Sequence, residues 1–137
     1  MTSFKRLLTF TLLCVSLCCL TVLLLTPTEA GANGPTDCEG KLGAYTPSLG
    51  GDRAFSLGTV ETSCDLSDVT VKLISGGRIL AQHHTVSHGA FIRVTTSSIR
   101  WKGCKTVRTH VRWRGGFVGW GYRYDKSRSS KSRKICF

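Results

Sequence analysis

Acidic residues are scarce in this chain, where eight Asp and Glu stand against 19 Lys and Arg and the formal net charge is +11. The shortage is greatest in the segment 100–137, which holds twelve basic residues and one acid, Asp125. The segment 33–98 is nearly balanced, with five basic and six acidic residues. Folding alone does not require such an asymmetry, and it indicates an anionic partner for the C-terminal segment.

The chain also lacks the motifs of common enzyme and metal-site classes. No C-x-x-C pair, G-x-S-x-G elbow, Walker loop or dinucleotide fingerprint is present, and no N-x-S/T sequon occurs. His84 and His88 are four residues apart, a ligand spacing that suits a helix, but the residues between them favour a strand and no third ligand is evident. We therefore expect neither a metal nor a cofactor.

The N-terminus predicts a secretory signal peptide over residues 1–30. Two basic residues precede an apolar run over 7–25, and small residues follow at Ala30 and Ala32. We expect cleavage after one of these alanines, which leaves 31–137 as a single secreted β-domain. The apolar run is close to the roughly 20 residues that span a bilayer, so a retained signal anchor is the alternative.

Cleavage would remove three of the seven cysteines and leave Cys38, Cys64, Cys104 and Cys136. An even number of cysteines in a short exported chain predicts two disulfides, with three possible connectivities. We favour the sequential pairing, Cys38 with Cys64 and Cys104 with Cys136, because it closes the shorter loops. In the loop-entropy model each bond would stabilise the fold by about 3 to 4 kcal/mol.

The hydrophobic pattern indicates an all-β fold. No segment has a helical period over ten or more residues, and Thr, Val and Ser stand where a helix would favour Ala, Leu and Glu. Two β-rich runs, 69–74 and 78–82, flank Gly76-Gly77 and predict a hairpin.

A further β-rich run covers residues 90–96, and two more enclose Gly115-Gly116. The segment 33–58 is rich in turn residues, so we expect an irregular lead-in with one strand near 54–60. Together these runs predict a small disulfide-stabilised sandwich or barrel of about six strands.

The basic C-terminal hairpin is predicted to pair 105–114 with 117–124 around Gly115-Gly116, and alternation sorts its side chains onto two faces. One face collects β-branched and aromatic residues, typical of a core: Val107, Thr109, Val111, Trp113, Val118, Trp120, Tyr122 and Tyr124. The other face is cationic. It places Arg108, His110, Arg112 and Arg114 opposite Arg123, Gly121, Gly119 and Phe117.

This cationic face is the predicted anion-binding site. Arg108 opposite Arg123 is destabilising, and a bound anion, fraying or a shifted register would relieve the repulsion. The facing glycines either admit a ligand or mark a bulge or a twist. A sheet face that uses positive charge to block edge pairing is the other interpretation.

The residues after Tyr124 alternate serine with basic residues, and their self-repulsion predicts a flexible tail that is held at Cys136. The predicted anion-binding set covers both the hairpin and this tail. It contains Arg108, His110, Arg112, Arg114, Arg123, Lys126, Arg128, Lys131, Arg133 and Lys134.

Two aromatic residues, Trp101 and Phe117, do not fall on the predicted core face of the hairpin. They are the predicted surface aromatics, suited to stacking or to a membrane interface. Covering an edge of the core is the alternative role.

A nuclease is the competing hypothesis. It would use His110 with His84 or His83 as acid and base, Glu61 as a further candidate, and Arg112 or Arg108 to steady phosphate. Because these residue types are common, we expect no catalysis and keep a small secreted basic ribonuclease as the alternative.

The sequence therefore predicts a secreted cationic protein that binds an anionic envelope, a membrane surface, an acidic polysaccharide or nucleic acid. Antimicrobial or toxin-like action would follow from such binding. A secreted inhibitor or effector that docks on an acidic partner protein is the third class considered.

Overall fold

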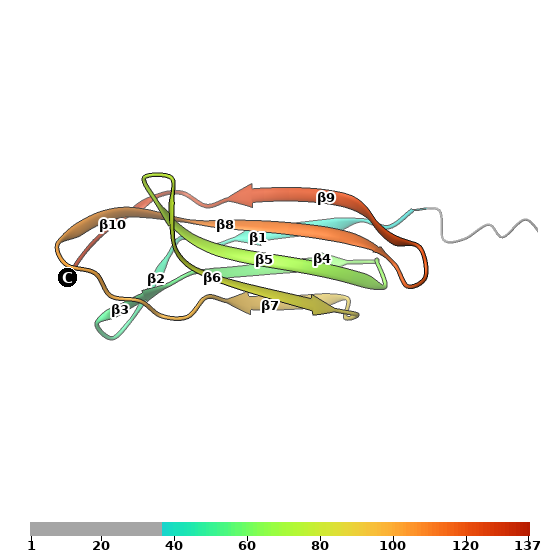
Figure 1. Ribbon diagram of the computed structural model, residues 1–137, viewed down its shortest axis with the longest axis horizontal. Coiled ribbons are helices and arrows are strands. Elements are labelled where there is room, and N and C mark those ends of the chain that lie inside the picture. The colour runs from blue at the N-terminus through green and yellow to red at the C-terminus, as the bar shows by residue number, and fades with distance from the viewer. Residues whose placement is uncertain (1–36) are drawn as a thin grey trace, which may run out of the picture. The chain divides into compact units, whose positions relative to one another are not determined.

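A computed structural model describes residues 37–137, which all belong to one compact unit. Within this range there are ten strands and no helix (Figure 1). No helix there has the length and hydropathy needed to cross a membrane. The predicted signal peptide lies outside the described residues.

The strands follow one another in the order β1 (Gly40–Ala44), β2 (Ser48–Gly50), β3 (Arg53–Phe55), β4 (Leu57–Thr62), β5 (Leu66–Ser75), β6 (Arg78–Ser87), β7 (Phe91–Thr95), β8 (Cys104–Phe117), β9 (Gly121–Ser129) and β10 (Arg133–Cys136). The all-β prediction is confirmed, but the expected number of strands, about six, was too low.

Two main sheets carry the fold, and their strands pair antiparallel. One has the order β1-β4-β7, and in the other β5 lies between β6 and β8, while β8 pairs along its second edge with both β9 and β10. Strands β2 and β3 form a separate short ribbon. The sheets do not close into a barrel.

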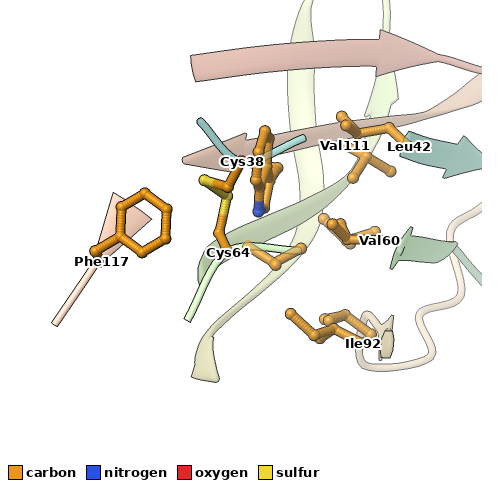
Figure 2. Packing of buried hydrophobic residues seen from close by; sticks show 11 residues of the cluster. Cys38, Leu42, Val60, Cys64, Ile92, Val111 and Phe117 are labelled. Carbon is orange, nitrogen blue, oxygen red and sulfur yellow. A yellow bond between two sulfur atoms is a disulfide. The ribbon is translucent and has the colours of Figure 1, made fainter. Parts of the chain in front are cut away.

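One hydrophobic core takes side chains from both main sheets (Figure 2). Val111 and Trp113 of β8 are fully buried and pack in the same cluster as Leu42, Val60 and Ile92 of the other sheet. The indole of Trp113 donates a hydrogen bond of 2.9 Å to Ser67 Oγ, so its only polar atom is satisfied inside the core.

Two disulfides are present, and the sequential pairing is confirmed. Cys38 and Cys64 are buried and join the segment before β1 to the segment between β4 and β5. Cys104 and Cys136 are exposed and join the start of β8 to the end of β10. The first bond belongs to the core, whereas the second fastens an edge strand.

The lead-in is more regular than predicted, because it also contains β1 and β2, and the single strand predicted near 54–60 is divided between β3 and β4. Two of its glycines, Gly40 and Gly58, stand in strands where a neighbouring side chain occupies the space that a Cβ would take. A Cβ on Gly40 would lie 2.5 Å from the Trp113 ring, and one on Gly58 would lie 2.7 Å from Val71 and Val111. Here glycine marks close sheet packing.

The first predicted hairpin is confirmed, with longer strands than expected. Strands β5 and β6 meet at Gly76-Gly77, whose φ angles are 53° and 79°. Only glycine adopts this left-handed conformation without strain, so the two residues fit a tight turn.

The second predicted hairpin has a different turn. Strand β8 continues through Gly115-Gly116, and the chain reverses at Val118-Gly119-Trp120 instead. Positive φ angles occur at Gly119 (84°) and Gly121 (75°) but not at the earlier pair. A Cβ on Gly116 would lie 1.9 Å from the Gly121 carbonyl oxygen, so this glycine permits close approach of the two strands.

The shifted turn changes which side chains are buried. Val107, Thr109, Val111 and Trp113 are fully buried, as predicted. Val118, Trp120 and Tyr122 are exposed instead of buried, and Tyr124 is half-buried against the core. Phe117, predicted at the surface, is only 5% exposed and lies in the core.

The predicted flexible tail is also wrong, because it forms strands. Its first residues belong to β9, and Arg133–Cys136 forms β10, which pairs with β8 over Cys104–Val107. Ile135 is buried in a second core cluster with Val107, Leu73 and Ala54. One apolar side chain and one disulfide thus hold a segment that charge repulsion alone would extend.

Candidate anion-binding face

Alternation along β8 turns its odd-numbered residues into the core and its even-numbered residues outward. The strands beside β8 add side chains to the same outward surface, which we call the outer face. Its residues are Arg108, His110, Arg112 and Arg114 on β8, Asp68, Thr70 and Lys72 on β5, His84 on β6, and Asp125, Ser127 and Ser129 on β9.

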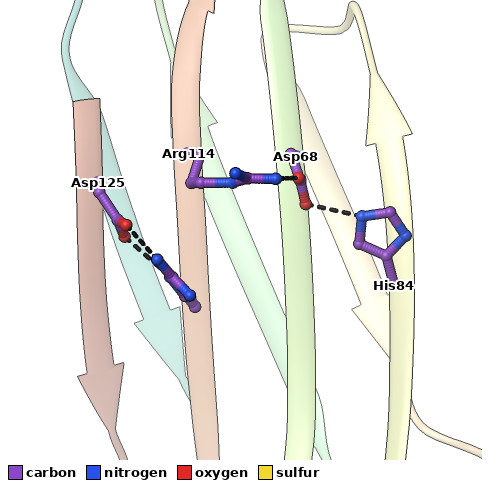
Figure 3. Close-up of polar contacts among 5 residues, drawn as sticks. Asp68, His84, Arg114 and Asp125 are labelled. Atoms are coloured by element: carbon purple, nitrogen blue, oxygen red, sulfur yellow. Dashed lines mark hydrogen bonds and ion pairs between the residues drawn. The ribbon is translucent and has the colours of Figure 1, made fainter. Parts of the chain in front are cut away.

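At one end of the outer face the cations have carboxylate partners (Figure 3). Asp68, only 7% exposed, accepts hydrogen bonds from Arg114 and from His84 Nε2, the latter at 2.7 Å. Arg112 Nε donates to Asp125 Oδ1 at 3.0 Å, and a second contact joins the same two side chains. This end is an internally neutralised network.

The hydrogen bond from Arg112 also lowers the pKa of the Asp125 carboxyl, so that side chain stays ionised. Asp68, Thr70, His84, Arg112 and Arg114 line a shallow depression of about 220 Å³.

The other end of the outer face is positively charged and unpaired. Among the described residues, neither Lys72 nor Arg108 belongs to an ion pair. Lys72 lies directly opposite His110, and Arg108 lies opposite Ile74. We call Lys72, Arg108 and His110 the cationic cluster.

His110 lies among these positive charges, and its pKa is lowered. Burial lowers this pKa most, and the positive charges of Lys72, Arg108 and Arg112 lower it further. Its Nδ1 is hydrogen-bonded to Ser129 Oγ at 2.9 Å. A bound anion would raise the pKa of His110, opposite to the effect of each of these positive charges.

Arg123 does not lie opposite Arg108, so the predicted repulsion between them is absent. It is the extra residue of a bulge in β9, between Tyr122 and Tyr124. Its guanidinium lies 5.4 Å from the centre of the Trp120 ring. The glycines expected to face His110 and Arg112 are instead those of the turn, so they open no space above the cations.

The remaining predicted cations are divided between the two sides of the sheet. Lys134 pairs with Thr106 and therefore extends the outer face beside Arg108. Arg128 and Arg133 reach the other way, where they donate to the carbonyl oxygens of Leu42 (2.9 Å) and Pro47 (3.2 Å). Lys126 approaches the Gly40 carbonyl oxygen, and Lys131 is exposed between β9 and β10.

Sequence reasoning missed Lys72, Asp68 and Thr70 as members of the site. They alternate along β5, which was a visible signal, but the pattern does not reveal that β5 pairs with β8. The antiparallel register in the structure sets Lys72 opposite His110 and Asp68 opposite Arg114.

The residues of the nuclease hypothesis are divided between two faces and two sheets. His84, His110, Arg108 and Arg112 lie on the outer face, but His84 and His110 are on strands separated by β5 and pair with different residues of it. His83 is the next residue to His84 in a strand and so faces the opposite side. Glu61 lies on β4, in the other sheet.

His84 and His88, whose spacing was considered for a metal site, have separate hydrogen-bond partners. His84 is bonded to Asp68, while His88 Nδ1 is hydrogen-bonded to the Asp65 carbonyl oxygen at 2.9 Å. Over residues 37–137, no group of three or more His, Cys, Asp or Glu side chains is arranged to hold a metal ion.

Trp101, the other predicted surface aromatic, is half-buried and packs against the second core cluster. Its ring meets Phe137 edge-to-face, with 4.9 Å between the centroids. Trp101 therefore covers an edge of the core.

No protein-family model matches the chain, and no curated protein matches it significantly in sequence. The interpretation of the outer face is consequently drawn from its geometry and charge.

Proposed function

We propose that this chain is a secreted cationic protein that binds an anionic surface or polymer, without catalysis, through its outer face. We further propose that the two main sheets are the layers of a β-sandwich, since one core takes side chains from both. The observation that carries the functional proposal is the cationic cluster, where unpaired Lys72 and Arg108 flank a histidine whose pKa is lowered.

The spacing of the cations supports a repeating ligand. Side chains two residues apart on a strand are about 6.8 Å apart, so β8 presents a regular row of basic groups. Arginine adds a planar fork that binds phosphate, sulfate or carboxylate with two hydrogen bonds. A polymer or an array of headgroups would meet several of these groups at once.

The two disulfides are consistent with an extracellular protein. Export through the proposed signal peptide would bring the outer face to the envelopes of other cells. Antimicrobial or toxin-like action is the consequence that we propose for this binding.

A sulfated-polysaccharide column tests the proposal. We expect Lys72→Ser/Arg108→Ser to elute at clearly lower salt than the unchanged protein. The matched control is Lys41→Ser/Arg93→Ser, which removes the same charge from exposed positions of the other sheet. Equal losses in the two variants would show that net charge, and not the outer face, determines retention.

Incubation with RNA separates binding from cleavage. We expect bound RNA to remain intact. Cleavage that disappears in His84→Ala or His110→Ala would replace the proposal with the ribonuclease alternative. Saturable capture of one acidic protein, without retention on the polysaccharide, would favour the inhibitor or effector class.

A further inference from the structure

The turn between β8 and β9 exposes a group of large apolar side chains. Val118 is 64% exposed, Trp120 51% and Tyr122 38%. We call residues 118–123 the hairpin tip. Turns are usually built of small polar residues, and nothing in the backbone of this turn requires an aromatic ring.

The backbone of the hairpin tip directs these side chains outward. Gly119 and Gly121 take positive φ angles on either side of Trp120, and the Trp120 amide donates to the Phe117 carbonyl oxygen at 3.0 Å. Phe117 is the residue that packs into the core at the base of the turn, and the apolar side chains that follow it in the turn are not part of the core cluster. The exposed side chains are therefore available for an external contact.

Each exposed ring of the hairpin tip has an arginine over its face. Arg123 lies 5.4 Å from the centre of Trp120, and Arg114 lies 4.8 Å from the centre of Tyr122. Because Arg114 also belongs to the outer face, the tip adjoins the end of that face where Arg114 is paired with Asp68, while Arg123 belongs to no ion pair among residues 37–137. Apolar, aromatic and cationic groups thus share one end of the sheet.

We propose that the hairpin tip inserts into the headgroup region of an anionic lipid bilayer. The inference rests on the proposed function, because the outer face would attract the protein to the anionic bilayer, and Arg123 at the tip would then meet the lipid phosphates. Tryptophan and tyrosine favour the interface between headgroups and acyl chains, and arginine is attracted to anionic lipids. Charge complementarity and side-chain type therefore agree on the same partner.

The shape of the hairpin tip favours a bilayer over a sugar chain or a protein. No residue of the tip lines the depression of the outer face, and the tip is a projecting turn instead of a groove. A projection of this kind gains little from a rigid partner without a matching pocket. A soft interface accommodates it and removes its apolar surface from water.

Sedimentation with phosphatidylcholine vesicles, with and without phosphatidylglycerol, tests the inference on protein exported into culture medium. We expect binding to the anionic vesicles, reduced about tenfold or more in Val118→Ser/Trp120→Ser because the inserted apolar surface is lost. The single variant Trp120→Tyr should keep most of the vesicle binding. The matched control, Leu49→Ser/Phe91→Ser, changes exposed apolar residues of β2 and β7 and should bind as the unchanged protein does.

Retention on the polysaccharide column distinguishes the two proposals. All tip variants should keep it, and urea unfolding like that of the unchanged protein would show that they are folded. Retention without any vesicle binding, or equal vesicle binding by tip and control variants, would overturn the lipid inference and leave the proposed function standing. Tip-dependent capture of a polysaccharide or an acidic protein in place of vesicles would also overturn it. If the unchanged protein binds neither the column nor the vesicles, both the proposed function and the lipid inference are overturned.

Discussion

At the scale of single residues, the lowered pKa of His110 makes the stability of the fold depend on pH. The folded pKa of this residue is lower than the ordinary 6.5, so the unfolded chain takes up a proton first as the pH falls. The free energy of unfolding is therefore unaffected by this group above pH 6.5. It decreases as the pH falls from 6.5 to the lowered pKa, and below that pKa the effect is constant. Between about pH 8 and pH 5, we expect Tm to fall less in His110→Gln than in the unchanged protein, as thermal melts would show.

A bound anion should act in the opposite direction, because it favours protonated His110. Retention on a polyanion should therefore increase as the pH falls through the histidine range, more in the unchanged protein than in His110→Gln. The same pH dependence in both proteins would mean that His110 does not sense the ligand.

Asp68 contributes to stability and opposes anion binding. It satisfies Arg114 and His84 from a buried position, so Asp68→Ala should cost about 1–2 kcal/mol in urea unfolding. The same change should strengthen polyanion retention, since it leaves two basic side chains without their acid. Opposite signs in the two measurements would be hard to explain by general damage to the fold.

The control for Asp68 is Asp52→Ala. Asp52 is paired with Arg100 at 2.7 Å, but it is 65% exposed, so its removal should cost less than about 0.5 kcal/mol. A cost as large as that of Asp68→Ala would contradict the view that burial distinguishes the two pairs.

At the scale of strands, Gly116 allows β8 and β9 to approach each other. We expect Gly116→Ala to destabilise the fold by about 2 kcal/mol or more, because the new methyl group would meet backbone that cannot move aside. Gly89→Ala is the control, since its Cβ would make only ordinary contacts, the nearest at 3.5 Å. The free energies of unfolding of the two variants in urea should differ clearly. Similar values would contradict the close approach of β8 and β9 at Gly116.

Strand β10 depends on a disulfide that is accessible to reductant. Cys104 and Cys136 are exposed, whereas Cys38 and Cys64 are buried, so mild thiol treatment should open the Cys104–Cys136 bond first. Alkylation followed by mass spectrometry would show the order. Loss of the Cys38–Cys64 bond first would contradict the assignment of that bond to the core.

The strand scale also shows how far the sequence predicts this structure. Alternation is local, so the inward row of Val107 to Trp113 and the outward row of arginines beside it follow from the sequence. The turn does not, because Gly76-Gly77 and Gly115-Gly116 look alike as dipeptides. What separates them is the approach of Trp113 and Gly121 to the second pair, and this is tertiary structure.

The candidate site follows the same division. Arg108, His110, Arg112 and Arg114 share a face because they alternate on one strand. Lys72 completes the cationic cluster only through the register of β5 on β8. The partner of Arg114, Asp68, was hidden for the same reason, whereas Asp125, the partner of Arg112, was missed because the wrong turn shifted the register of the hairpin.

At the scale of the whole molecule, most basic residues lie in the C-terminal third, and their effect on binding should be steep in salt. A plot of log affinity for a nucleic acid against log salt should have a negative slope, shallower by about 2 in Lys72→Ser/Arg108→Ser, one for each lost phosphate contact. Isothermal titration at several salt concentrations would measure it. If the slope is the same in the variant and in the unchanged protein, neither Lys72 nor Arg108 contacts phosphate.

Strand β8 pairs with β5, β9 and β10, and it supplies Trp113 to the middle of the core, yet it begins only at Cys104. Strands β1, β4 and β7 pair with one another and β5 pairs with β6, but the second edge of β5 stays open until residues 104–117 have been made. Contacts so distant along the chain slow folding, and here they span about forty residues of intervening chain. A chain whose central strand arrives after its neighbours exposes their apolar side chains in the meantime, so its yield should depend on how fast β8 docks.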